Sequence, residues 1–105
     1  MEHYSAAELK ERLSAEPAPL LLDVREAWEY ELCHIAGSRH IPMGRIAEVL
    51  DELDAEQEIV VICHHGSRSQ RVTDFLESNG FSKVANLDGG IHAWACEVDP
   101  SLTQY

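Results

Sequence analysis

The chain has 105 residues, 45% of them hydrophobic, and a formal net charge of -11. This length suits one compact domain, so we expect residues 1–105 to form a single domain that acts as a monomer. The acidic balance argues against nucleic acid or anionic lipid as a partner, and the sequence offers neither a membrane-spanning stretch nor an apolar secretory signal, so a cytoplasmic protein is expected.

The first half of the chain alternates helical and extended patterns. Ser5 and Glu8 form a capping box that begins a helix, which ends before Pro17. Four further elements are expected: a strand over 20–24, a short helix over 25–32 with Trp28 and Leu32 on one side, a strand over 38–42 and a helix over 43–53.

The second half contains the clearest strand, Ile59 to Ile62, which is β-branched throughout, as in a central parallel strand. Its expected successors are a helix over 67–79, a strand over 83–87, a glycine turn, a short helix over 91–95 and a loose tail. Such alternation predicts an α/β fold, with a mainly parallel sheet flanked by helices on both faces.

Ligand sites in such sheets lie beyond the carboxyl ends of the strands. Here those ends bring together Arg25, Pro42, Cys63 and the turn at Asp88. Two segments, 32–47 and 59–73, contain no Asp or Glu but several Arg and His residues. If they meet in space, they would form a local site for an anion.

Cys63 stands where the central strand ends and a polar turn begins. Gly66-Ser67-Arg68 then leads into a helix, so several backbone N–H groups and a helix N-terminus should point at the thiol and favour its thiolate. This arrangement could bind a tetrahedral oxyanion or hold a reactive thiolate or persulfide. The alternative is a buried structural cysteine, which would have apolar rather than cationic neighbours.

The remaining cysteines and histidines do not predict a metal site. Three cysteines without a CxxC pair do not suggest a disulfide framework, and the run Cys63-His64-His65 lacks the usual zinc spacing. We expect the helix before Cys33 to return the chain to the opposite edge of the sheet, away from Cys63. The distance of Cys96 from the site is open, and both are expected to be spectator thiols.

Four segments together resemble the rhodanese family, in family order and over nearly the whole chain. The segment at 63–69, CHHGSRS, resembles the family's active-site loop, C-x-x-G-x-R-S. The others are LLDVRE at 21–26, HIAGSRHIP at 34–42 and LDGGIHAW at 87–94. Cys33 and Ala36 depart from the family pattern but lie outside the proposed chemistry.

The resemblance implies a rhodanese-like (flavodoxin-like) domain and a sulfurtransferase that needs neither metal nor organic cofactor. Cys63 would be the nucleophile and persulfide carrier, taking sulfur from a small anionic donor such as thiosulfate and passing it to cyanide or a thiol. The backbone of His64, His65, Gly66, Ser67, Arg68 and Ser69 would cradle the sulfur. The Arg68 side chain, or that of His64, would help to bind the donor.

Two alternatives stay open. Phosphatases and arsenate reductases of this fold resemble C-x5-R, whereas four residues separate Cys63 from Arg68, which favours sulfur transfer. The second alternative is a non-catalytic persulfide carrier that serves a protein partner. Among other residues, Asp23 and Arg25 are expected to orient the loop or form a salt bridge, and Trp28 and Trp94 to pack in the core or lid. Arg39 and Arg45 either line the donor entrance or lie in solvent.

Overall fold

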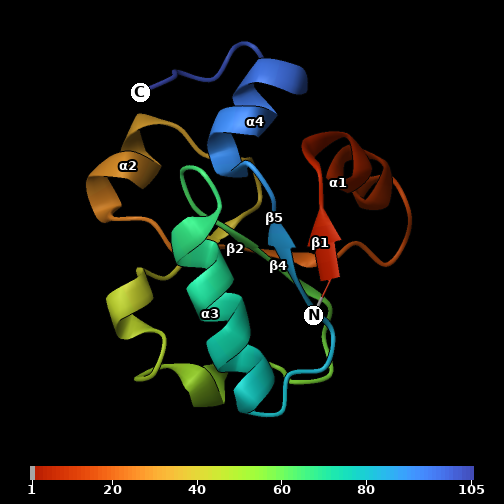
Figure 1. Cartoon of the computed structure of the whole chain (residues 1–105), viewed down its shortest axis with the longest axis vertical. Coiled ribbons are helices and arrows are strands. Elements are labelled where there is room, and N and C mark those ends of the chain that lie inside the picture. Colours follow the sequence, from red (N-terminus) through yellow and green to blue (C-terminus); the bar gives the residue numbers. More distant parts are fainter. Residues whose placement is uncertain (1) are drawn as a thin grey trace.

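The computed structural model describes residues 2–105 and confirms the α/β class (Figure 1). Five strands form one sheet in the order β1-β5-β4-β2-β3, and every neighbouring pair is parallel. The strands are β1 (Glu2–Tyr4), β2 (Leu20–Asp23), β3 (Arg39–His40), β4 (Ile59–Ile62) and β5 (Val84–Leu87). The helices are α1 (Ala6–Leu13), α2 (Ala27–Leu32), α3 (Ser67–Ser78) and α4 (Gly90–Glu97).

Helices cover the sheet on both faces, because side chains of the central strands alternate between two apolar cores. Val61 faces one core with Val72 and Leu76 of α3. Val60 and Ile62 face the other, which also contains apolar residues of α1 and α4. All four residues of β4 are buried, as expected for a strand covered on both sides. No helix within residues 2–105 is both long enough and apolar enough to span a bilayer.

One predicted helix is absent from the structure, and one strand of the structure was not predicted. Residues 43–53 do not form an α-helix but two short 3-10 helices, Met43–Arg45 and Leu50–Glu52. Gly44 lies in the first turn and weakens an α-helix there, and Ile46 N–H bonds to the Met43 carbonyl three residues earlier. Strand β1 was not predicted, because its three residues have no apolar pattern and it forms through pairing with β5.

Candidate active site

The Cys63 thiol lies directly after β4, at the carboxyl edge of the sheet, where the sequence placed it. Cys63 is almost fully buried, with 1% of its surface exposed. Its Sγ accepts a hydrogen bond from Gly66 N–H at 3.0 Å and lies 3.2 Å from Ser69 Oγ. Two polar hydrogens can therefore be directed at this sulfur when it carries negative charge.

The Ser69 hydroxyl connects the thiol to a buried polar network. Besides Cys63 Sγ, its oxygen contacts the Gly66 carbonyl at 3.1 Å and Asn86 Oδ1. Asn86 Nδ2 in turn donates to the Gly66 carbonyl at 3.3 Å and to Asp88 Oδ1 at 3.0 Å. Because a hydroxyl has one hydrogen, Ser69 can donate it to only one of these acceptors at a time: the sulfur, the Gly66 carbonyl or Asn86 Oδ1. Sequence reasoning missed Asn86, although a polar residue inside the apolar strand β5 signals such a network.

The first turn of α4 holds the loop from the other side. Ile91 N–H donates to the Cys63 carbonyl at 2.8 Å, and His92 N–H donates to the His64 carbonyl at 3.1 Å. The backbones approach so closely that a Cβ on Gly90 would lie 2.5 Å from both carbonyl oxygens. Gly66 turns the chain with a φ of +109°, a region that favours glycine. The glycine turn therefore sets the shape of the thiol loop.

Arg68 lies at the start of α3, and its guanidinium is held by Glu29 of α2. Two parallel hydrogen bonds of 2.7 and 2.8 Å join Arg68 to the Glu29 carboxylate, whose side chain is 4% exposed. The bonds from Arg68 lower the pKa of Glu29 to about 2, and Glu29 raises the pKa of Arg68. The resemblance led us to expect that Arg68 helps to bind an anionic donor, and its pairing with Glu29 leaves little net positive charge beside the loop. Glu29 was not among the predicted site residues.

Beneath this pair, Arg25 is fully buried and bonded on all sides. It forms a salt bridge with Asp23 at 2.8 Å and donates to the Cys33 carbonyl at 2.6 Å. Burial opposes its charge, but the bonds to Asp23 and Tyr105 outweigh burial and raise its pKa. The predicted salt bridge between Asp23 and Arg25 is therefore present.

The sequence predicted a loose tail at the end of the chain, but the structure shows that Tyr105 is bonded to residues of the site. The Tyr105 hydroxyl accepts a bond from Arg25 at 2.9 Å and donates to Glu29 at 2.7 Å. Burial is the main cause that raises the pKa of Tyr105 to about 12. The Tyr105 ring stacks on His64, with centroids 3.8 Å apart and an interplanar angle of 6°. Long-range contacts of this kind leave no pattern in the sequence.

Two other expectations, for Cys33 and Trp28, are corrected. Cys33 lies beside His64 and Tyr105, at the same edge as the site rather than opposite, because the six residues of α2 are too few to carry the chain back across the sheet. Trp28 is 61% exposed and packs edge-on against Tyr105 instead of entering the core. Trp94 is buried as expected. Cys96 is exposed on α4, with its Sγ 3.8 Å from His92 Nε2.

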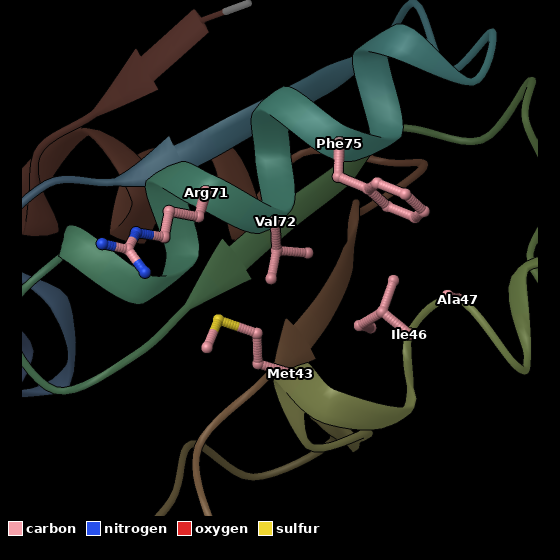
Figure 2. A pocket seen from close by; sticks show the side chains of 6 residues that line it. All are labelled: Met43, Ile46, Ala47, Arg71, Val72 and Phe75. Atoms are coloured by element: carbon pink, nitrogen blue, oxygen red, sulfur yellow. The ribbon is translucent and has the colours of Figure 1, made fainter.

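The two segments without acidic residues do meet, but mainly through apolar side chains. They line a groove of about 200 Å³ whose walls include Met43, Ile46 and Val72 (Figure 2). Arg71 lies at one end of this groove and Phe75 at the other. Arg39 and Arg45 are exposed beside acidic partners, Glu52 at 3.6 Å and Glu48 at 3.5 Å. The expectation of an anion site built from both segments is therefore not met, and Arg71 is the cation at the groove.

The structure is therefore a parallel α/β sheet with a buried thiol in the loop between its central strand β4 and helix α3. Comparison with known proteins gives the family: residues 5–97 match the model of the rhodanese-like domain. The chain belongs to the rhodanese-like domain family, as the four sequence segments indicated.

Individual relatives agree with this assignment. The chain is 40% identical over 100 residues to "Putative sulfurtransferase YtwF" of Bacillus subtilis, covering 95% of this chain and 96% of that protein. It is 38% identical to "Thiosulfate sulfurtransferase GlpE" of Pseudomonas fluorescens over 79 residues, which are 75% of this chain and 72% of the relative. It is also 38% identical to "Putative sulfur carrier protein YrkF" of Bacillus subtilis over 90 residues, which are 86% of this chain and 49% of that relative.

Solved structures share the whole fold. The crystal structure of a rhodanese-like domain protein from Staphylococcus aureus superposes with a TM-score of 0.87 at 30% identity, covering 100% of this chain and 99% of that one. These likenesses establish the protein as a rhodanese-like sulfurtransferase or sulfur carrier.

Proposed function

We propose that the protein is a sulfurtransferase that carries sulfur as a persulfide on Cys63 and uses a donor such as thiosulfate. The observation that carries the proposal is the environment of the Cys63 sulfur. It is buried, it accepts a hydrogen bond from Gly66 N–H, and it touches the Ser69 hydroxyl at the head of α3. These donors favour negative charge on sulfur both before and after transfer.

In the first step, the Cys63 thiolate attacks the outer sulfur of thiosulfate. The sulfur–sulfur bond of the donor breaks, sulfite leaves with the bonding electron pair, and Cys63 becomes a persulfide. In the second step, cyanide or a thiolate attacks the outer sulfur of the persulfide. The Cys63 thiolate leaves, and thiocyanate or a new persulfide is released. Neither step consumes an oxidant, a reductant or a cofactor.

The backbone from His64 to Ser69 supports the outer sulfur in this proposal. The N–H groups of Ser67, Arg68 and Ser69 open α3, so they have no carbonyl one turn earlier to bond. They are therefore free to bind a sulfur anion. With only four residues between Cys63 and Arg68, the loop suits one added sulfur better than a phosphate group. Because Glu29 holds the Arg68 guanidinium, we expect Arg68 to act mainly through the loop backbone.

The test is thiocyanate formation from thiosulfate and cyanide. Cys63→Ser should lose at least about a hundredfold in rate, since it removes the group that forms the intermediate. Cys33→Ser and Cys96→Ser are the matched controls and should keep near-normal rates. Full activity in Cys63→Ser would overturn the proposal.

One observation favours a second candidate, a persulfide carrier loaded by a neutral persulfide or a partner protein. The Arg68–Glu29 pair leaves little net positive charge to attract thiosulfate. A carrier would accept sulfur from a neutral low-molecular-weight persulfide and discharge it slowly to cyanide. Comparing loading and discharge rates with both donors separates the two candidates: fast loading with slow discharge identifies the carrier.

A further inference from the structure

Three histidine side chains gather beside the thiol loop, and no step of the proposed sulfur transfer uses their imidazole rings. They are His64 and His65, which follow Cys63, and His92 in the first turn of α4. Each offers a ring nitrogen, and these nitrogens lie within 4.8 Å of one another. The ring centroids of His64 and His65 are 3.9 Å apart, and those of His65 and His92 are 5.1 Å apart.

Two of these rings carry a buried nitrogen without a partner. Within residues 2–105, His64 Nε2 and His92 Nδ1 are the buried side-chain nitrogens or oxygens that lack a hydrogen bond. A buried polar atom left without a hydrogen bond lowers the stability of the fold by about 1–3 kcal/mol. Two such atoms in one cluster are unusual and need an explanation. A shared ligand that accepts both lone pairs would remove this cost.

The His64 ring is held in place beside the cluster. The Tyr105 ring stacks on it, with centroids 3.8 Å apart and an interplanar angle of 6°. This contact limits rotation of the His64 ring, whose buried Nε2 has no hydrogen-bond partner. An imidazole nitrogen with an available lone pair is a common metal ligand.

The backbone presents the three rings together before any ligand arrives. Bonds from Ile91 N–H to the Cys63 carbonyl and from His92 N–H to the His64 carbonyl fix α4 to the loop. Zinc bonds to nitrogen at about 2.0–2.1 Å, which places tetrahedral ligand atoms about 3.4 Å apart. His65 is exposed, so rotation of its ring can close the remaining distance.

We propose that His64, His65 and His92 form a binding site for a divalent transition-metal ion such as Zn²⁺ or Co²⁺, with a coordination position left open. Imidazole nitrogens suit late first-row ions rather than Mg²⁺ or Ca²⁺. The net charge of -11 adds a general attraction for cations. Sequence spacing did not predict the site, because His92 is remote along the chain from the other two.

The test is titration of the full chain with Co²⁺ and Zn²⁺, followed by calorimetry and visible absorption. We use the Cys63→Ser protein so that the loop thiol cannot serve as a ligand. One ion per chain should bind, with the visible bands of a nitrogen-ligated tetrahedral Co²⁺ and no sulfur charge-transfer band. His92→Gln and His65→Gln should each weaken binding at least about tenfold.

His3→Gln, which changes an exposed histidine outside the cluster, is the matched control and should bind as before. Circular dichroism confirms folding of each variant, and because the His65 ring is exposed, its variant keeps the test valid if His92→Gln is unstable. Three results would overturn the proposal: no binding by the Cys63→Ser protein, binding by the His92 and His65 variants as tight as that of the Cys63→Ser protein, or a sulfur charge-transfer band. These readouts are independent of sulfur transfer.

Discussion

At the scale of single residues, the hydrogen on the Ser69 hydroxyl is shared between the sulfur and the polar network around Asn86. Ser69→Ala removes the donor 3.2 Å from Cys63 Sγ, while Gly66 N–H remains. A hydrogen bond to a charged group contributes about 1.5–3 kcal/mol, so we expect sulfur transfer to slow by about tenfold to a hundredfold. Steady-state rates of Ser69→Ala and of Ser67→Ala, an exposed control, test this. Equal rates in both would show that the hydroxyl does not act on the sulfur.

Also at this scale, the bonds from Arg68 lower the pKa of Glu29 to about 2 from an ordinary 4.5. The unfolded chain therefore binds a proton at Glu29 before the folded protein does. The ionised form stabilises the fold above pH 4.5, and this stabilisation, at most about 3 kcal/mol, is lost as the pH falls towards 2. Glu29→Gln should flatten the dependence of the urea midpoint on pH across this window. An unchanged slope would contradict the assignment.

At the scale of elements, the contact between α4 and the thiol loop depends on Gly90. A Cβ at this position would lie 2.5 Å from the Cys63 and His64 carbonyl oxygens. We expect Gly90→Ala to lower the free energy of unfolding by about 1–3 kcal/mol, because the thiol loop must move to make room for the Cβ. We expect the rate of sulfur transfer to fall as well. Gly44→Ala is the control, since a Cβ there meets nothing within 4 Å, and its stability should change by less than about 1 kcal/mol. Thermal unfolding and transfer rates that match wild type in Gly90→Ala would refute this.

At the scale of the whole molecule, Tyr105 joins the end of the chain to the groups beneath the site. Tyr105→Phe removes the hydroxyl between Arg25 and Glu29, both of them charged. We expect a loss of about 1.5–3 kcal/mol in the free energy of unfolding. Tyr30→Phe, whose hydroxyl donates to the Ser38 carbonyl at 2.9 Å, should lose only about 1 kcal/mol. Equal stability of Tyr105→Phe and wild type in urea unfolding would contradict this role.

Much of this architecture could be predicted from the sequence because it is local. Short stretches of neighbouring residues define the apolar run of β4, the capping box at Ser5 and the turn after Cys63. These local patterns were enough to predict that the thiol lies at the carboxyl edge of the sheet. Strand β1 could not be predicted, because only its pairing with β5 makes it a strand. The helix predicted over 43–53 is absent although its apolar spacing is helical, because Gly44 weakens the first turn and the backbone bonds to carbonyls three residues earlier.

The partners of the site residues were harder to predict than their positions. The sequence indicated Arg68 but not its bond to Glu29, which is 39 residues away, and Tyr105 bonds to Glu29 across 76 residues. These contacts depend on how α2 and the chain end pack, which no local pattern reports. The charge balance around the thiol therefore became visible only in three dimensions.

The central claim is that Cys63 itself carries the transferred sulfur, and intact-mass measurement tests it most directly. Wild-type protein is treated with thiosulfate alone, weighed, digested to locate the modification, and then treated with cyanide. We expect a gain of one sulfur atom on the peptide that contains Cys63, its loss on adding cyanide, and no gain in Cys63→Ser. A gain that persists in Cys63→Ser, or that is found on Cys33 or Cys96, would contradict it.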